Sequence, residues 1–224
     1  MTKALMYEVQ YKDYSPDFVF YKNALDKEIP VVEFGSGTGR ITSQLLKSGF
    51  TVFGIEKEIS YKKYFIENIK DKAYSEKFNY LNDVNEIDFN CNIIFPFNVL
   101  FYLTENEVAN VLNKTKQTTF NKIIFETDNI QTVKEENFLT KEHWQDQLLF
   151  KEETIPDNSR IIVKNEVLQD NESILKFQYP LYIHKADILL NLYRSIFKDL
   201  KLYGDFDFCS YDLNSKKLIA IIDK

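Results

Sequence analysis

The chain has 224 residues, 44% of them hydrophobic and 28% charged, with a formal net charge of −6. The length suits one α/β domain with a buried core rather than two independent domains. The composition excludes a disordered chain, and no apolar run is long enough to span a membrane. The acidic balance argues against a large non-specific nucleic-acid surface, which needs basic residues to neutralise phosphates.

The first residues of the chain and its two cysteines give two further expectations. The first residues, MTKALMYEVQYKDYSPDF, contain no hydrophobic stretch followed by a small-residue cleavage site, so we expect no signal peptide and a cytoplasmic protein. Cys91 and Cys209 each lie in an apolar, strand-like run without a CxxC partner. We therefore expect two buried, reduced thiols and no metal site.

The first two thirds of the chain predict a parallel sheet. Up to about Asp26, aromatic residues alternate with charges, which predicts a helical cover over residues 1–27. Short apolar runs then alternate with segments of helical spacing, as in a doubly wound sheet. Thr104 and Glu107 form a capping box that predicts a helix start. The predicted strands are 31–34, 51–55, 78–81, 91–97 and 121–127, and the predicted helices after the first two are 40–48 and 59–69.

The pattern changes after Asp128. Three predicted strands are separated by the turn sequences PDNS and QDNE, which indicates a small antiparallel β lid of about residues 146–184. A helix over 186–200 and an antiparallel hairpin over 202–222 complete the predicted fold. We expect one α/β domain over residues 1–224, with a Rossmann-like, doubly wound, mostly parallel mixed sheet and an inserted lid. The predicted lid strands are 148–153, 160–168 and 173–183.

The segment VVEFGSGTGRITSQLLKSGFTVFGIEKE carries the chemistry. Gly35, Gly37 and Gly39 form GxGxG at the carboxyl end of a predicted strand, where the backbone can turn sharply and approach a ligand. A dinucleotide fingerprint needs a third glycine where this chain has Arg40, which disfavours a pyrophosphate site.

Two acids flank this loop. Glu33 precedes the glycines and can anchor the positive end of an amino-acid-like ligand, directly or through water. Glu56 closes the next strand, where a carboxylate accepts hydrogen bonds from both hydroxyls of a ribose. Together, the glycines and acids favour a cationic nucleoside ligand.

These residues resemble the class I S-adenosylmethionine (SAM)-dependent methyltransferase family, whose first motif is ExGxGxG and whose second is the acid closing the second strand. The resemblance covers most of the chain and is closest from Val31 to Thr127. It implies SAM as the cofactor. The implied cofactor contacts are Tyr14, Glu33, Gly35, Ser36, Gly37, Gly39, Glu56, Lys57, Asp83, Val84, Phe97 and Asn98.

Several of these residues have structural alternatives. Asp83 falls where the family commonly has an acid facing the adenine amino group, and the alternative is a helix N-cap. Tyr14 either closes over the cofactor or packs in the interior. The tetrapeptide NPPY, which holds an amino nitrogen of a nucleobase or glutamine in some relatives, is replaced by FPFN, so methylation of DNA bases and glutamine loses weight.

The lid resembles, in arrangement, that of small-molecule methyltransferases, and it implies a small acceptor and a possible homodimer. His143 is a candidate base or substrate contact near the mouth of the site, and Tyr102 a candidate acceptor contact, whereas His184 is expected to make a structural hydrogen bond. The predicted function is methyl transfer from SAM to a nitrogen or oxygen atom of a small molecule, with no nucleic-acid or membrane partner. An RNA or protein methyltransferase and a non-catalytic SAM-binding regulator are the alternatives.

Overall fold

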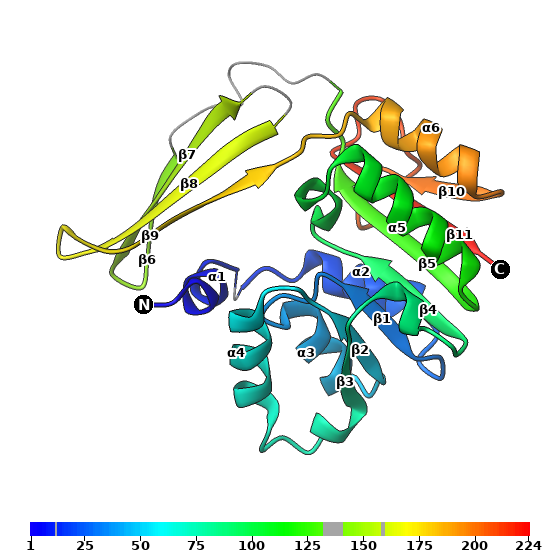
Figure 1. The fold of residues 1–224 in the computed structure, drawn as a ribbon, viewed down its shortest axis with the longest axis horizontal. Coiled ribbons are helices and arrows are strands. Elements are labelled where there is room, and N and C mark those ends of the chain that lie inside the picture. Colours follow the sequence, from blue (N-terminus) through cyan, green and yellow to red (C-terminus); the bar gives the residue numbers. More distant parts are fainter. Residues whose placement is uncertain (12, 132–140, 158–159) are drawn as a thin grey trace.

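The computed structural model describes residues 1–11, 13–131, 141–157 and 160–224. A seven-stranded sheet forms the centre of the molecule, and a four-stranded antiparallel sheet extends to one side of it (Figure 1). Parallel strands predominate in the large sheet, and helices cover both of its faces. The predicted fold class is therefore confirmed.

The large sheet has the strand order β10-β11-β5-β4-β1-β2-β3. β1 pairs in parallel with β2 and β4, so the glycine loop after β1 opens at the centre of the sheet. β11 runs antiparallel to β5 and to β10. The strands are β1 (Val31–Phe34), β2 (Val52–Ile55), β3 (Phe78–Leu81), β4 (Cys91–Phe95), β5 (Phe120–Asp128), β10 (Leu200–Tyr203) and β11 (Lys217–Asp223).

Alternate residues of the central strands supply two separate hydrophobic clusters. Val31 and Ile94 pack beneath α2, α3 and α4, whereas Val32 and Ile93 pack beneath α5 and α6 on the opposite face. β1 and β4 are buried along their whole length, which explains why their sequences read as continuous apolar runs. The helices are α1 (Lys3–Tyr11), α2 (Pro16–Ala24), α3 (Arg40–Lys47), α4 (Ile59–Ile69), α5 (Glu105–Gln117) and α6 (Ala186–Ile196).

Short 3-10 helices connect several of these elements. They are η1 (Ser75–Lys77), η2 (Val84–Glu86) and η3 (Val99–Tyr102). The capping box predicted for α5 is present, because the Thr104 side chain accepts from the Glu107 N–H and the Glu107 carboxylate accepts from the Thr104 N–H at 2.8 Å.

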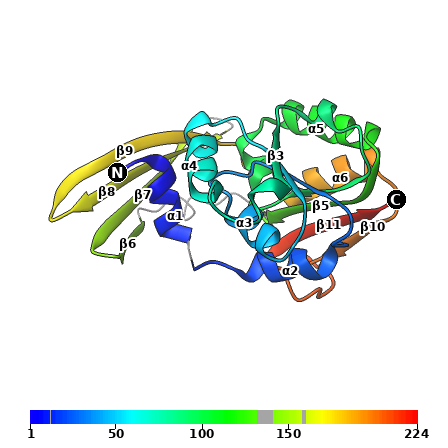
Figure 2. The ribbon, with the colours of Figure 1, turned by 90° about the horizontal axis from the view of Figure 1, so that it is seen from below.

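The lid sheet consists of β6 (Lys141–Gln145), β7 (Leu148–Asp157), β8 (Arg160–Gln169) and β9 (Glu172–Leu181). It has one strand more than the sequence predicted, because β6 is almost fully exposed and carries no apolar alternation. α1 lies between the lid and α4 (Figures 1 and 2), and Met6 of α1 shares a small cluster with Leu148, Phe150 and Val167 of the lid. Part of the predicted N-terminal cover, α1, therefore packs against the lid sheet.

Two predictions near the carboxyl end need correction. Cys91 is buried as expected, but Cys209 is exposed and lies outside the strands. Its segment turns because the Asp205 carboxylate accepts the N–H groups of Asp207 and Cys209, and β10 therefore ends at Tyr203. α6 stops at Ile196, short of the predicted end at residue 200, and the left-handed Asp199 (φ 55°) starts the chain into β10.

Within the described ranges, no helix is both long and apolar enough to cross a membrane.

Candidate functional site

The glycine loop after β1 has a backbone that only glycine adopts easily. Gly35 and Gly39 have φ values of 70° and 82°. A β-carbon at Gly35 would lie 2.2 Å from Val99 Cγ2, and one at Gly39 would lie 2.1 Å from the Phe65 ring. Conformation and space therefore both require glycine at these two positions.

Glu33 is a buried acid on β1, beneath this loop, and is 2% exposed. Its Oε2 accepts a hydrogen bond from the Thr42 hydroxyl of α3 at 2.5 Å. Burial removes water from the carboxylate and raises the pKa of Glu33 to about 8, although the Thr42 hydroxyl and the Arg40 charge oppose the rise. A cation next to Glu33 would reverse this shift by stabilising the charged form.

Glu56 joins the end of β2 to the glycine loop. Its Oε2 accepts the Gly37 N–H at 2.7 Å and its Oε1 accepts the Glu58 N–H at 2.8 Å. A carboxylate offers about four acceptor positions, so Glu56 can accept further hydrogen bonds from a ligand. The predicted pair of acids thus flanks the loop on adjacent strands, as β1 and β2 are neighbours.

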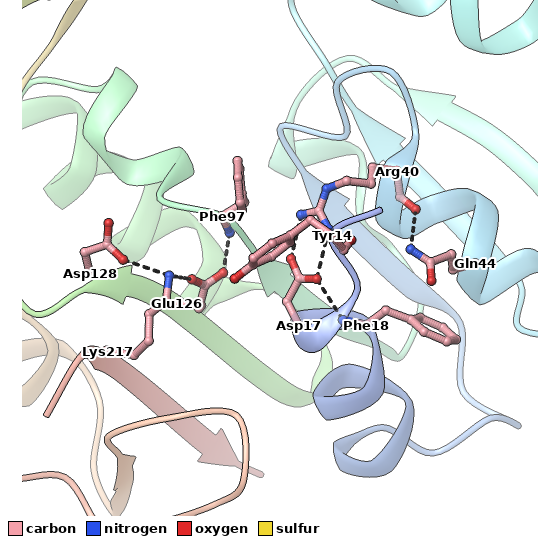
Figure 3. A network of polar contacts seen from close by, with 9 residues as sticks. All are labelled: Tyr14, Asp17, Phe18, Arg40, Gln44, Phe97, Glu126, Asp128 and Lys217. Carbon is pink, nitrogen blue, oxygen red and sulfur yellow. Dashed lines mark hydrogen bonds and ion pairs between the residues drawn. The ribbon is translucent and has the colours of Figure 1, made fainter. Parts of the chain in front are cut away.

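A buried ion pair lies on the other side of the loop (Figure 3). The Arg40 guanidinium donates to both Asp17 oxygens, at 2.9 and 2.5 Å, and to the Tyr14 carbonyl at 3.1 Å. The side chains of Arg40 and Asp17 are 8% and 0% exposed. The guanidinium also lies 4.6 Å from the centre of the Phe97 ring and 5.2 Å from that of Tyr14. Arg40 therefore fixes α2 and two aromatic rings against the start of α3.

A second network holds the turn after β4 (Figure 3). Lys217 Nζ of β11 lies 2.8 Å from both Glu126 Oε1 and Asp128 Oδ1 of β5. The Phe97 N–H donates to Glu126, and the Asn98 amide donates to Asp128 at 2.9 Å. These bonds stabilise two consecutive left-handed residues, because Phe97 and Asn98 have φ values of 52° and 58°. Tyr14 lies between the two networks.

A cavity of about 900 Å³ extends from the glycine loop to the inner face of the lid. This volume is within the range of small-molecule sites. Most residues predicted for the site line it, from elements far apart in the sequence. These are Tyr14, Glu33, Gly35, Ser36, Gly37, Glu56, Lys57, Phe97, Asn98 and Tyr102.

Gly39, Asp83, Val84 and His143 are not in the wall of this cavity. Gly39 gives room to Phe65, and Val84 is 1% exposed in the core. Asp83 caps η2 by accepting the Asn85 N–H at 2.9 Å, and it lies 3.3 Å from Lys114 Nζ, so the expected capping contact is present. His143 is exposed on β6 and stacks on Phe150 with 4.9 Å between ring centres.

The other histidine has the expected structural environment. His184 is buried and its Nε2 lies 2.9 Å from the Leu103 carbonyl oxygen. Tyr102 does line the cavity and stacks on Tyr179 of β9 with 5.6 Å between ring centres.

The sequence did not indicate several residues that line or support the cavity. Arg40 stands out in the sequence as a large residue after the glycines, but nothing near Asp17 in the sequence indicates that the two side chains pair. Glu126 had a readable signal, an acid inside the apolar run IIFETD of a predicted strand. Glu152, Asn165 and Tyr179 of the lid line the cavity without any local motif. In the described part of the chain, no group of three or more His, Cys, Asp or Glu side chains could hold a metal ion.

Comparison with known proteins adds one relative and several solved structures. No protein-family model matches the chain. A protein named as an uncharacterized methyltransferase from Bacillus velezensis is 37% identical over 67 residues, which is 28% of this chain and 32% of that protein. The chain therefore covers only about a third of the length of this curated relative.

Solved structures match along nearly the whole chain. The CcbJ methyltransferase from Streptomyces caelestis superposes with a TM-score of 0.78 at 17% identity, over 96% of this chain and 94% of that one. A SAM-dependent methyltransferase from Clostridium acetobutylicum gives 0.76 at 10% identity, over 98% and 96%. A SAM-bound amino pentose methyltransferase from Micromonospora echinaspora gives 0.66 at 10% identity, over 97% and 94%. The chain therefore has the fold of the class I SAM-dependent methyltransferases.

Proposed function

We propose that this protein transfers a methyl group from SAM to a nitrogen or oxygen atom of a small-molecule acceptor. The observation that carries the proposal is the pair of acids beside the glycine loop, one buried without a cationic ion-pair partner and one at the end of the adjacent strand. SAM, when bound, supplies a methyl group on a positively charged sulfur, which makes that carbon electrophilic.

The residues present fit this cofactor. Glu33 would hold the ammonium group of the methionine part, which supplies the charge that its buried carboxylate lacks. Glu56 would accept hydrogen bonds from the ribose hydroxyls while keeping those from Gly37 and Glu58. The glycine loop is open at Gly37, which donates to Glu56, because a β-carbon there would have no neighbour closer than 3.9 Å.

The lid supports a small acceptor. Residues of the lid and of α1 line the part of the cavity that lies away from the glycine loop, and the volume of the cavity is about 900 Å³. Such a cover excludes water and holds the acceptor near the cofactor, which is most of what a methyl transfer requires of a protein. The named acceptor of the amino pentose methyltransferase is also a small molecule, which supports the same class here.

Calorimetric titration tests the cofactor assignment. Wild-type protein should bind SAM saturably and NADH not at all. Glu56→Ala should weaken SAM binding by about 10-fold or more, since a charge-assisted hydrogen bond is lost. Glu67→Gln, which changes an exposed acid of α4, is the matched control and should bind as the wild type does. NADH binding without SAM binding would contradict the proposal.

A further inference from the structure

The inner and outer faces of the lid differ in how their charges are paired. On the outer face, acids and lysines of neighbouring strands form ion pairs, with Lys151–Glu142 at 2.9 Å, Lys164–Glu153 at 3.6 Å and Lys176–Glu166 at 3.0 Å. Such exposed pairs are ordinary for a solvated sheet surface. No such ion pair between neighbouring strands is found among the described residues of the inner face.

Glu152 is the acid of β7 that points inward. It lines the cavity, whereas its neighbours Lys151 and Glu153 point outward, as the alternation of a strand requires. No described residue forms a hydrogen bond or ion pair with its carboxylate. Lys141 lies opposite Glu152 on the edge strand and also lines the cavity, but it is exposed and its Nζ is not within the 4 Å of an ion pair with Glu152.

Asn165 lies directly opposite Glu152 on the next strand, and Phe177 lies opposite Asn165 on the strand after that. All three line the cavity. Asn165 is 8% exposed, and its buried Nδ2 forms no hydrogen bond of regular geometry with the described residues, although it lies close enough to the Tyr179 phenol to oppose the rise of that group's pKa. A buried amide donor without an acceptor is unfavourable, so a ligand oxygen is the natural partner.

Tyrosines complete this part of the cavity. Tyr11 of α1, Tyr102 of η3 and Tyr179 of β9 all lie close enough to Glu152 for its charge to raise their pKa values, after the larger effect of burial. The pKa of Tyr11 rises to about 12, so its phenol is neutral at physiological pH. The Tyr11 ring also lies 5.0 Å from Phe97, which places this cluster beside the glycine-loop side of the cavity. Neutral aromatic rings around a carboxylate are a favourable environment for an organic cation.

From Glu152, Asn165 and these tyrosines, we infer that the acceptor is a small amino alcohol, whose ammonium group binds Glu152 and whose hydroxyl oxygen accepts from Asn165. This inference rests on the proposed function, because it assigns the acceptor of the same site. An amine carries a positive charge at neutral pH and so supplies the charge that Glu152 lacks. A neutral alcohol could accept from Asn165 in the same way but would leave the Glu152 carboxylate without a cation.

Binding of simple probes tests the assignment without requiring catalysis. The probes are trans-2-aminocyclohexanol, cyclohexylamine and cyclohexanol, and their affinities are measured by ligand-detected NMR with and without S-adenosylhomocysteine. Wild-type protein should bind cyclohexylamine about 10-fold or more tighter than cyclohexanol, and the amino alcohol tighter still.

Three variants separate the contributions. Glu152→Gln should reduce the preference for the amine over the alcohol to about 2-fold or less. Asn165→Val should keep that preference but lose the advantage of the amino alcohol over the amine. Glu153→Gln, the adjacent outward acid, should behave as the wild type does. Binding of S-adenosylhomocysteine, measured by calorimetry, shows that each variant has folded.

Several results would overturn the inference. These are equal binding of amine and alcohol by the wild type, no binding of any probe, or an amine preference that survives Glu152→Gln. If S-adenosylhomocysteine binds and the amine preference is absent, the inference fails while the proposed function stands. If S-adenosylhomocysteine does not bind, the proposed function fails, and the probes alone still report on the lid site.

Discussion

Glu33→Gln should stabilise the ligand-free protein and weaken its binding of SAM. The reason is the buried carboxylate, whose pKa rises from 4.5 to about 8 on folding because burial disfavours its charge. Between these two values the unfolded chain loses the proton and the folded chain keeps it. The contribution of Glu33 to stability therefore falls as the pH rises, and the loss is complete only above pH 8.

The size of the effect follows from the same values. From pH 4.5 to pH 7, at about 1.4 kcal/mol for each pH unit, Glu33 lowers the free energy of unfolding by about 3 kcal/mol. Glutamine has almost the same shape, its oxygen can accept from the Thr42 hydroxyl, and it does not ionise. The variant should therefore be about 3 kcal/mol more stable than the wild type at pH 7 and nearly equal to it at pH 4.5.

Urea unfolding at several pH values between 4.5 and 8.5 measures this difference, and calorimetry with SAM measures the opposite effect on binding. Glu67→Gln, an exposed substitution on α4, controls for loss of one negative charge and should shift neither quantity. A stability difference between Glu33→Gln and the wild type that does not change with pH would refute the reasoning. A variant that binds SAM as tightly as the wild type would refute the ammonium contact.

Three further perturbations test the support of the site. Lys217→Met leaves Glu126 and Asp128 without their shared cation and should lower the free energy of unfolding in urea by about 3 to 5 kcal/mol. Adding Glu126→Gln should restore part of this loss. A loss below about 1 kcal/mol would contradict a paired network. Gly39→Ala should destabilise the protein more than Gly37→Ala, by about 1 to 3 kcal/mol, because only the former introduces a β-carbon against Phe65; equal thermal shifts would argue against this packing. Thr104→Ala should cost about 1 kcal/mol through loss of the α5 cap, and a serine at the same position should restore most of it.

The parallel core was predictable because its signals are local. β1 and β4 are buried on both faces, so their apolar runs are nearly continuous. The capping box of Thr104 and Glu107 predicts the residue at which α5 begins. The lid strand β6 could not be read in this way, since its residues are almost all exposed and follow no apolar alternation. The apolar composition of the segment FDFCS predicts a strand at Cys209, but hydrogen bonds from Asp207 and Cys209 to the Asp205 carboxylate turn the chain there instead.

In the candidate site, too, local residues could be predicted from the sequence and contacts between distant residues could not. Glu33, the glycines and Glu56 belong to one strand, loop, helix and strand unit, so their spacing predicts their proximity. The supporting contacts join distant positions, with Asp17 and Arg40 23 residues apart and Glu126 and Lys217 91 apart. No periodicity in one sequence pairs such residues. Only the position of Glu126 inside an apolar strand signalled that a buried acid needed a partner.

The buried acids around the glycine loop show where a cationic ligand is needed. Asp17, Glu33 and Glu126 are all 2% exposed or less. Arg40 neutralises Asp17, and Lys217 neutralises Glu126, each by a direct ion pair. Glu33 receives only the Thr42 hydroxyl as a hydrogen-bond donor among the described residues. Because a buried carboxylate without a cation is unfavourable, the fold retains at this one position a cost that a positively charged ligand would remove. Glu152 under the lid is only half-buried, but it lines the same cavity and has no ion-pair partner among the described residues, so a second cationic group would find a carboxylate there.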